Sequence, residues 1–468
     1  MISPSRIVSI QGTQLYLLPV HTRVPLKFGA EKLTEVTCAR VCLEVRNLQG
    51  ESAMGWGETP LSVQWVWPGS LPYALRLARL QGFCRLLAQE LASLSADGHP
   101  MEISRDFQET RLPELLEQSN AAVPAAEAMP WLAALVCFSA FDIALHDAYG
   151  NLVQKPSFET LNSEFMGRDL ASLLDGDQRF IGRYPADFLL SQRRDRMRAW
   201  HLVGGLDPLE TGDPVEVIPD DSHPVFLRDW IRRDGLECLK IKLRGNDAAW
   251  DYERLLRIGQ ISLEEGVLWL SADFNCTVHD PAYVTQILDR LRDEAPRISA
   301  LILYVEQPFP YELELYPIDV YSVSARKPLF LDESAHDWKH VRMGRALGWN
   351  GVALKTCKTL TGALLSACWA QVNGMTLMVQ DLTNPMLAQI PHLCLAAHLP
   401  TIMGVETNAM QYYPEASAIE ARVHPGIYQR RGGCVDLSSI RGSGLGYRLS
   451  EMERPLPPCD VRFGSLDN

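Results

Sequence analysis

The chain has 468 residues, of which 47% are hydrophobic and 22% are charged. This composition is typical of a globular protein that buries a large core, and it excludes disordered and fibrous classes. Lysine and arginine number 44 against 57 acidic residues, which gives a formal net charge of −13. Because nucleic acids and anionic membranes bind surfaces rich in cations, this balance argues against either as a partner.

The sequence also bears on the compartment. The N-terminus has no solid apolar block followed by a small-residue cleavage site, which a signal peptide requires. No stretch reaches the roughly 18–20 apolar residues that a membrane span needs. None of the eleven cysteines belongs to a Cys-X-X-Cys pair, and several lie inside apolar segments, as small hydrophobic residues do. We therefore expect a cytoplasmic protein without a membrane partner.

The first part of the chain predicts an α+β unit. Residues 14–20 and 36–46 are rich in β-formers, and Gly-Trp-Gly-Glu-Thr-Pro at 55–60 ends this region, which favours an antiparallel meander. Apolar residues recur at helical spacing over 73–94 and 128–152, which predicts two helices. The charged, irregular stretch that follows indicates a connecting or inserted segment.

From about residue 196, short apolar runs alternate with amphipathic segments. The runs end in polar residues roughly every 25 to 30 positions, which is the length of one βα unit. With residues 200–203 as the first strand there are eight runs, and the other seven end at positions 242, 273, 306, 332, 355, 380 and 406. A doubly wound sheet would give the same alternation. The (β/α)₈ barrel is favoured because it brings the charged strand ends together at one mouth.

These strand ends carry carboxylates and lysines in a set that suits metal-assisted catalysis. Three carboxylates on three consecutive strands can surround a hard divalent cation such as Mg²⁺. Lysines held beside that cation and beside one another would have a lowered pKa and could act as general bases. The carboxylates are Asp273, Glu306 and Asp332, and the lysines are Lys240, Lys242 and Lys355.

Each of these residues also has a structural interpretation. An acidic residue at a strand end often caps the helix that follows. Lys240 and Lys242 could protect an edge strand, and Lys355 could be a surface lysine ahead of a helix. The common phase of the strand ends and the apolar neighbours of the two paired lysines favour the functional interpretation.

The motifs resemble those of the enolase superfamily, and within it the muconate lactonizing enzyme subgroup of mandelate racemase/muconate lactonizing enzyme-like proteins. The segments 139–147 and 444–446 resemble the helix before the barrel and the closing Gly-Leu-Gly. The strand-end motifs that match, in order, are Lys-X-Lys at 240–242, Asp-X-Asn at 273–275, Glu-Gln-Pro at 306–308, Asp-Glu-Ser at 332–334 and Leu-Lys at 354–355.

This resemblance implies an α/β fold, namely a (β/α)₈-type, TIM-like barrel with an α+β capping domain. Residues 1–195 would form the cap with its insertions, residues 196–410 would form the catalytic barrel, and residues 411–468 would return to the cap.

Two loops of the cap, at 27–29 and 57–60, would close over the barrel mouth. Trp65 and Trp67 follow the second loop. They could line an apolar substrate pocket, or they could belong to the core of the long insertion at 61–125.

The resemblance further implies a role for each site residue. Asp273, Glu306 and Asp332 would bind Mg²⁺, or Mn²⁺ in its place, whereas strand alternation would turn Glu333 away. The catalytic residues would be Lys242 and Lys355, as acid/base catalysts on opposite faces of the substrate, and Lys240, which helps to hold the substrate carboxylate. The further substrate-binding residues would be Phe28, Asn275 and Glu406.

The implied reaction is Mg²⁺-dependent removal of a proton α to a carboxylate, through an enediolate whose charge a divalent cation neutralises. In the family, such lysine pairs serve cycloisomerisation, elimination of water as in o-succinylbenzoate synthesis, and racemisation or epimerisation of N-acyl amino acids or dipeptides. We therefore expect an isomerase or lyase that acts on a small-molecule carboxylate and, like its relatives, forms a homo-oligomer.

Two alternatives stay open at this point. One is acid-sugar dehydration, as in the His-based subgroups of the same superfamily. Here Lys355 holds the sixth-strand position, and His392 lies in an apolar helix where a packed core histidine is expected. The other is a barrel that binds a carboxylate without catalysis, and the retained lysines and carboxylates argue against it.

Overall fold

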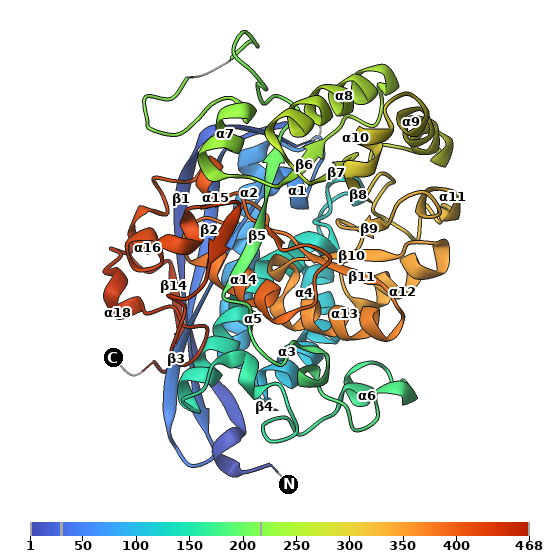
Figure 1. Ribbon diagram of the computed structural model, residues 1–468. Coiled ribbons are helices and arrows are strands. Elements are labelled where there is room, and N and C mark those ends of the chain that lie inside the picture. Colours follow the sequence, from blue (N-terminus) through green and yellow to red (C-terminus); the bar gives the residue numbers. More distant parts are fainter. Residues whose placement is uncertain (1, 29–30, 216–217, 467–468) are drawn as a thin grey trace.

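A computed structural model describes residues 2–28, 31–215 and 218–466. Its strands form two sheets: an antiparallel sheet at one side of the molecule and a mostly parallel sheet that curves into a barrel (Figure 1). This is the barrel with an α+β cap that the sequence predicts, so the predicted fold class is confirmed.

The antiparallel sheet has five strands, of which four follow the order β14-β1-β2-β3, and the short β4 (Asp97–Gly98) pairs with the start of β1. The predicted meander is present, and its strands are longer than expected because β1 and β2 pair from Val8–Asn47 to Phe28–Glu31. The strand bounds are Val8–Phe28 for β1, Glu31–Asn47 for β2, Ser52–Pro60 for β3 and Val461–Gly464 for β14.

Both predicted helices of the cap are present, as α2 (Tyr73–Ala92) and α5 (Trp131–Leu152). The insertion between them adds α3 (Pro100–Glu109) and α4 (Arg111–Asn120). After α5 the chain forms only short helical pieces up to the barrel. They are η3 (Ser157–Thr160), α6 (Leu170–Leu173), η4 (Gln178–Phe180) and η5 (Pro185–Phe188).

Helix α5 corrects one expectation. The segment Ala125–Leu152 is apolar and long enough to cross a membrane, and 83% of its most apolar window is buried. The expectation that no such segment exists is therefore wrong. The physical reason is that α5 packs against β2 and β3 on one side and against the barrel on the other, so that almost its whole circumference is apolar.

Residues 57–60, expected as a loop, instead form the end of strand β3. Gly55 and Gly57 face α5 so closely that an added Cβ would lie 2.0 Å from the backbone of Ala148 and Ala140. The glycines therefore serve a close contact between strand and helix rather than a turn. This strand end still reaches the barrel, because Glu58 accepts a hydrogen bond of 3.2 Å from the backbone of Ala388.

The barrel strands follow the order β11-β10-β9-β8-β7-β6-β5-β12. A bridge between Leu377 on β11 and Thr401, which precedes β12, brings the two ends of this sheet together. Each predicted apolar run forms one strand. The strands are β5 (Arg196–Val203), β6 (Cys238–Lys242), β7 (Trp269–Asp273), β8 (Ile302–Glu306), β9 (Leu329–Leu331), β10 (Gly351–Leu354), β11 (Thr376–Val379) and β12 (Val405–Glu406).

Helices between the strands cover the outside of the barrel (Figure 1). The helix predicted at 360–372 is present as α13. The main covering helices are α7 (Leu227–Asp234), α8 (Ala248–Glu265), α9 (Pro281–Glu294), α12 (Trp338–Leu347), α13 (Leu360–Val372) and α14 (Gln389–His398).

The barrel interior is filled by side chains that alternate along each strand. An apolar cluster fills the barrel on the N-terminal side of the polar strand ends. It consists of Trp200, Cys238, Tyr304, Phe330 and Met378. Because side chains on one face of a strand recur every second residue, the next inward position after four of these residues lies two residues further on, at the strand end or just past it. Those positions are Lys240, Glu306, Asp332 and Gln380, and all are buried.

The C-terminal segment contacts both units. Its strand β13 (Cys434–Asp436) pairs antiparallel with β5 of the barrel, and β14 pairs antiparallel with β1 of the cap. Residues 411–468 therefore join the barrel to the cap as well as returning to the cap.

Two aspartates of α5 fasten the cap to other parts of the chain. Asp142 accepts hydrogen bonds from the backbone of Leu360 at 2.6 Å and of Thr361 at 3.1 Å. It thereby satisfies free N–H groups at the start of α13 from outside that helix. Asp147 accepts from the backbone of Trp56 on β3 at 2.9 Å and of Leu445 at 2.7 Å.

Asp147 gives a testable pH dependence. Burial raises its pKa from 3.8 to about 7, even though two backbone N–H groups oppose this effect. Between about pH 4 and 7, Asp147 is therefore protonated in the folded protein and ionised in the unfolded chain. This difference contributes about 4 kcal/mol to the free energy of unfolding at low pH, and the contribution is lost as the pH rises through 7. Asp147→Asn should flatten the fall of the melting temperature between pH 5 and 7.5. An unchanged slope, measured by scanning calorimetry, would contradict this interpretation.

Candidate active site

The first wall of the site is built at the ends of β6 and β7, which run in parallel register with Lys242 beside Asp273. The ammonium of Lys242 lies 2.5 Å from Oδ2 of Asp273 and donates a 2.8 Å hydrogen bond to Oδ1 of Asn275. Asn275 in turn donates to the carbonyl of Leu243 at 2.6 Å. Asn275 therefore fixes the position of Lys242, and both side chains face the mouth of the barrel.

Lys240 lies deeper, among three carboxylates. Its Nζ is 2.6 Å from Glu306, 3.1 Å from Glu406 and 3.3 Å from Asp273. Only 3% of Lys240 is exposed, so these carboxylates compensate the cost of burying its charge. The carboxylate of Glu406 also accepts a 2.9 Å hydrogen bond from Asn408.

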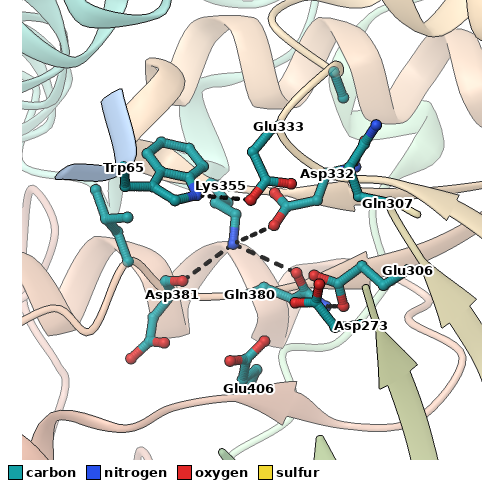
Figure 2. A network of polar contacts seen from close by, with 12 residues as sticks. Trp65, Asp273, Glu306, Gln307, Asp332, Glu333, Lys355, Gln380, Asp381 and Glu406 are labelled. Atoms are coloured by element: carbon teal, nitrogen blue, oxygen red, sulfur yellow. Dashed lines mark hydrogen bonds and ion pairs between the residues drawn. The ribbon is translucent and has the colours of Figure 1, made fainter. Parts of the chain in front are cut away.

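Lys355 enters from the opposite wall, directly after β10. Its Nζ lies 3.2 Å from Oδ2 of Asp332, 3.2 Å from the carbonyl of Asp381 and 3.4 Å from Oε1 of Gln380 (Figure 2). The amide of Gln380 donates to Oε2 of Glu306 at 2.6 Å. One continuous polar network therefore runs from Lys355 through Gln380 to Glu306.

The protein's own charges set the pKa values of these groups. Burial alone would lower the pKa of Lys242 and Lys355, but Asp273 and Asp332 respectively outweigh it, and both values are raised. Burial alone would raise the pKa of Asp332, but Lys355 and Lys358 lower it below its ordinary range. The expectation of lowered lysine pKa values rests on a bound divalent cation, and the protein groups by themselves act in the opposite direction.

The three predicted ligands come from neighbouring strands, since Asp273 and Glu306 end β7 and β8 and Asp332 follows β9. In the structure, each of these carboxylates is paired with a lysine. No group of three acidic, histidine or cysteine side chains in the described part of the chain is arranged to hold a metal directly. Oδ1 of the buried Asp332 nevertheless lacks a hydrogen-bond partner. Three buried carboxylates with one unsatisfied oxygen are the donor set that suits a hard divalent cation, so these residues fit Mg²⁺.

The backbone at these strand ends adopts unusual conformations. Asn275 and Cys276 after β7 have φ of 56° and 62°, and Gln307 after β8 has φ of 30°. Such residues cluster at functional sites, where the surrounding structure holds them. At Gln307 the reason is visible, because its Oε1 accepts hydrogen bonds of 2.7 Å from the backbone of Asp332 and from the hydroxyl of Ser334.

Trp65, on the short helix α1 (Val63–Val66), connects the cap to the barrel mouth. Its indole Nε1 donates to Glu333 at 2.9 Å, and its ring centre lies 5.6 Å from Nζ of Lys355 and 5.5 Å from Nζ of Lys358 (Figure 2). Glu333 thus also lies at the mouth, because β9 ends at Leu331 and strand alternation no longer turns the side chain away.

Trp65 should therefore affect substrate more than metal. Trp65→Leu removes both the ring beside the two ammonium groups and the hydrogen bond to Glu333, so we expect substrate affinity to fall by about tenfold. Trp65→Phe keeps a ring and should lose less. Mg²⁺ affinity, measured by calorimetry, should change little in either variant. A parallel loss of metal and substrate binding would contradict this role.

The remaining predicted residues have mixed outcomes. Lys27, in the expected cap loop, lines the same cavity as Lys242 and Asn275. Lys27 and the backbone of Phe28 form the end of strand β1 rather than a loop. The side chain of Phe28, and residue 29 of the expected loop, lie outside the described residues. Trp67 is buried, with its carbonyl accepting a hydrogen bond from Arg76, so it belongs to the core of the insertion.

His392 is a packed core residue, as expected. It is fully buried and hydrogen-bonded through Nε2 to the carbonyl of Glu406 at 2.7 Å, and burial lowers its pKa to about 4. Within the described ranges, no histidine forms an ion pair with the three predicted ligands.

Four residues of the site were not assigned from the sequence. Gln380 could have been found, since it lies two residues after the inward-facing Met378. Trp65 follows the second cap loop, so the sequence offers it as one of two alternatives without deciding between them. Lys358 and Asn408 carry no comparable signal, because each depends on contacts with distant parts of the chain. Lys358 is buried beside Lys355 and donates to the backbone carbonyls of Asp332 and Ala335.

The geometry agrees with comparisons to known proteins. Residues 225–453 match the family described as Enolase C-terminal domain-like. The chain carries an enolase C-terminal-like domain. This domain contains every predicted lysine and carboxylate of the site, and the predicted resemblance to the enolase superfamily is confirmed. No curated protein matches the chain.

Solved structures share the fold of the cap and the enolase C-terminal-like domain together. A muconate lactonizing enzyme from Mycobacterium smegmatis, complexed with muconolactone, is 16% identical with a TM-score of 0.61, and the match covers 94% of this chain and 96% of that one. A dipeptide epimerase from Enterococcus faecalis, complexed with Mg and a dipeptide, is 16% identical with a TM-score of 0.59, and the match covers 94% of this chain and 99% of that one. An N-succinyl Arg/Lys racemase from Bacillus cereus is 15% identical with a TM-score of 0.60, and the match covers 97% of this chain and 99% of that one.

Proposed function

We propose that the protein is a Mg²⁺-dependent isomerase or lyase that removes a proton α to a carboxylate through an enediolate. Lys242 and Lys355 are its acid/base catalysts. Asp273, Glu306 and Asp332 hold the cation, and Mn²⁺ could take the place of Mg²⁺. The substrate is a small carboxylate, and we expect the enzyme to act in the cytoplasm as a homo-oligomer.

The observation that carries this proposal is the placement of the two lysines. Lys242 ends the second strand of the barrel and Lys355 follows the sixth, so they approach the mouth from opposite walls. The three strands between them in the sheet are β7, β8 and β9, and these strands supply the carboxylates. A planar enediolate held at the carboxylates would present one face to each lysine, which is the geometry required for proton transfer on both faces.

Each remaining polar residue has a defined task in this scheme. A divalent cation, when bound, neutralises the charge that develops on the substrate carboxylate. Lys240 adds a fixed positive charge at the base of the site, and Asn275 and Gln380 orient Lys242 and Lys355 through hydrogen bonds. Trp65 covers Lys355 from the cap and limits the access of water.

The three enzymes whose structures are compared above are named for different reactions, although they share this fold. Whether this protein catalyses cycloisomerisation, elimination of water, or racemisation or epimerisation therefore depends on its substrate. We therefore test for the step that these reactions share, which is exchange of the α-proton. With Mg²⁺ present, N-acyl amino acids, dipeptides, lactones and acid sugars would be incubated in D₂O, and deuterium incorporation would be followed by mass spectrometry.

Deuterium incorporation that depends on Mg²⁺ and is lost in the double variant Lys242→Ala/Lys355→Ala would support the proposal. Incorporation restricted to acid sugars would favour dehydration instead. Mg²⁺-dependent binding of carboxylates without exchange in any class would indicate a non-catalytic carboxylate-binding barrel.

A further inference from the structure

The two ends of the barrel sheet meet along a seam between β11 and β12. At the end of this seam remote from the mouth, the backbone of Ile402 donates a hydrogen bond of 2.8 Å to Leu377, and Leu377 forms a bridge with Thr401. Nearer the mouth, β11 and β12 form no ladder with each other in the described part of the chain. Because buried backbone groups need partners, another contact must close the barrel there.

Asn408, two residues past the end of β12, lies at this position. Its backbone N–H donates to Oδ2 of Asp381, two residues past the end of β11, at 2.8 Å, and its side-chain amide donates to Oδ1 at 3.2 Å. The same amide donates to Glu406 at 2.9 Å, and its oxygen accepts a 3.0 Å hydrogen bond from the backbone of Leu202 on β5. Only 1% of Asn408 is exposed. One buried side chain therefore joins the mouth ends of β5, β11 and β12.

Asp381 connects this seam to Lys355. Asn408 holds the carboxylate of Asp381, and the backbone carbonyl of Asp381 accepts a hydrogen bond of 3.2 Å from Nζ of Lys355 (Figure 2). The other polar contacts of Lys355 include Asp332 at 3.2 Å and Gln380 at 3.4 Å. Because Asp332 is a proposed ligand of the cation, the carbonyl of Asp381 is the nearest anchor of Lys355 that stays outside the metal site.

We propose that Asn408 is a positioning residue for Lys355. It closes the barrel at the mouth, and by holding Asp381 it fixes the place from which Lys355 reaches the substrate. Lys242, on the opposite wall, is anchored by Asn275 instead. The inference rests on the proposed function, because it takes Lys355 as an acid/base catalyst. It implies that the loss of Asn408 impairs proton transfer on one face of the enediolate only.

The first test measures exchange of the α-proton for each enantiomer of a chiral substrate, with Mg²⁺ present. In Asn408→Ala, exchange of the enantiomer served by Lys355 should fall about 100-fold, because a displacement of about 1 Å can cost a catalytic group that much. Exchange served by Lys242 should change little. A merely structural role would lower both equally, so equal losses on the two faces, or no loss on either, would overturn the inference.

A second variant removes the same link with a smaller change in shape. Asn408→Asp keeps the oxygen that accepts from Leu202, but it loses the amide that donates to Asp381 and Glu406. It also places a third carboxylate beside these two. The same face-selective loss should therefore appear in Asn408→Asp, and this variant replaces Asn408→Ala in every measurement if the latter does not fold. Full exchange on the Lys355 face in Asn408→Asp would overturn the inference.

A double variant tests whether Asn408 acts through Asp381. Asp381→Ala keeps the backbone carbonyl and removes the carboxylate that Asn408 holds. If the two residues act as one unit, Asn408→Ala/Asp381→Ala should lose no more exchange on the Lys355 face than the more impaired single variant, because the effects of coupled residues do not add. Losses that multiply in the double variant would overturn the link through Asp381.

Thr401→Val is the matched control. Thr401 lies on the same seam, at the end remote from the mouth, where its hydroxyl donates to the carbonyl of Gly404 at 2.8 Å. Its loss weakens the seam without touching Asp381. The melting temperature should therefore fall, and exchange of both enantiomers should stay unchanged in the folded protein. A face-selective loss in Thr401→Val would show that any weakening of the seam displaces Lys355, and would overturn the specific role of Asn408.

Crystal structures separate this inference from the proposed function. In Asn408→Ala, Nζ of Lys355 should move from 3.2 Å to beyond the hydrogen-bond limit of about 3.5 Å from the carbonyl of Asp381, whereas Lys242 should keep its bond to Asn275. This displacement, found together with a parent that exchanges no substrate, would support the role of Asn408 and count against the catalytic proposal. An unmoved Lys355 would overturn the role of Asn408, with or without exchange in the parent.

Discussion

Asp332→Asn should weaken Mg²⁺ binding by about 100-fold or more, and Asp273→Asn and Glu306→Gln should do the same. Each change removes one of three anionic ligands, and even groups that only orient a metal ligand typically contribute 10- to 100-fold. The effect should be largest at Asp332, whose Oδ1 accepts no hydrogen bond within the described part of the chain. Isothermal calorimetry with MgCl₂ measures it, and circular dichroism verifies that each variant is folded.

Glu333→Gln is the matched control. This carboxylate is adjacent in sequence and also buried. Its Oε1 accepts a hydrogen bond from Trp65, whereas its Oε2, like Oδ1 of Asp332, accepts none within the described residues. Its loss should change Mg²⁺ affinity far less than the loss of Asp332. Equal Mg²⁺ affinity in the parent and all three ligand variants would refute the assignment, and a larger effect at Glu333 would transfer the ligand role to that residue.

Much of the barrel could be predicted because the signal is local. Each strand is a short apolar run, and each ends in a polar residue at the same edge of the sheet, so the spacing of Lys242, Asp273, Glu306 and Lys355 directly reflects the βα repeat. Alternation within a strand also explains why Lys240 and Lys242 both point inward.

The contacts between the cap and the barrel could not be predicted in this way, because they join residues far apart in the chain. Nothing near α13 in the sequence indicates that Asp142 satisfies the N–H groups at its start. Nothing near Trp65 indicates Glu333 as its partner. The glycines of β3 have a turn-like local pattern, whereas their actual cause is the close approach of α5.

The electrostatics of the site illustrate the same limit. The sequence places lysines and carboxylates at one mouth but does not give their pairing. In the fold, Asp273 lies within 2.5 Å of Lys242, and this contact raises the lysine's pKa despite burial. A lysine that acts as a base near neutral pH therefore needs its carboxylate partner engaged elsewhere, and a cation bound by Asp273 would provide this.

Lys242 and Lys355 should have separate roles in proton transfer. Because they lie on opposite walls, each should serve one face of the enediolate. With a chiral substrate, Lys355→Ala should lower α-proton exchange of one enantiomer by about 100- to 10,000-fold. It should spare, at least in part, exchange of the other enantiomer, for which Lys242 is still the base. Lys242→Ala should give the mirror result, and deuterium incorporation into each enantiomer, followed by NMR, measures both.

Lys327→Met provides the control, since Lys327 precedes β9 at the opposite end of the barrel and donates to the carbonyls of Ser299 and Ile302. It should leave the exchange of both enantiomers unchanged in the folded protein. If only one lysine variant abolishes exchange, and does so for both enantiomers, the enzyme is a one-base eliminase in which the other lysine stabilises charge. Full exchange of both enantiomers in both lysine variants would exclude lysine as the base and direct attention to Asp381, Glu406 or His392.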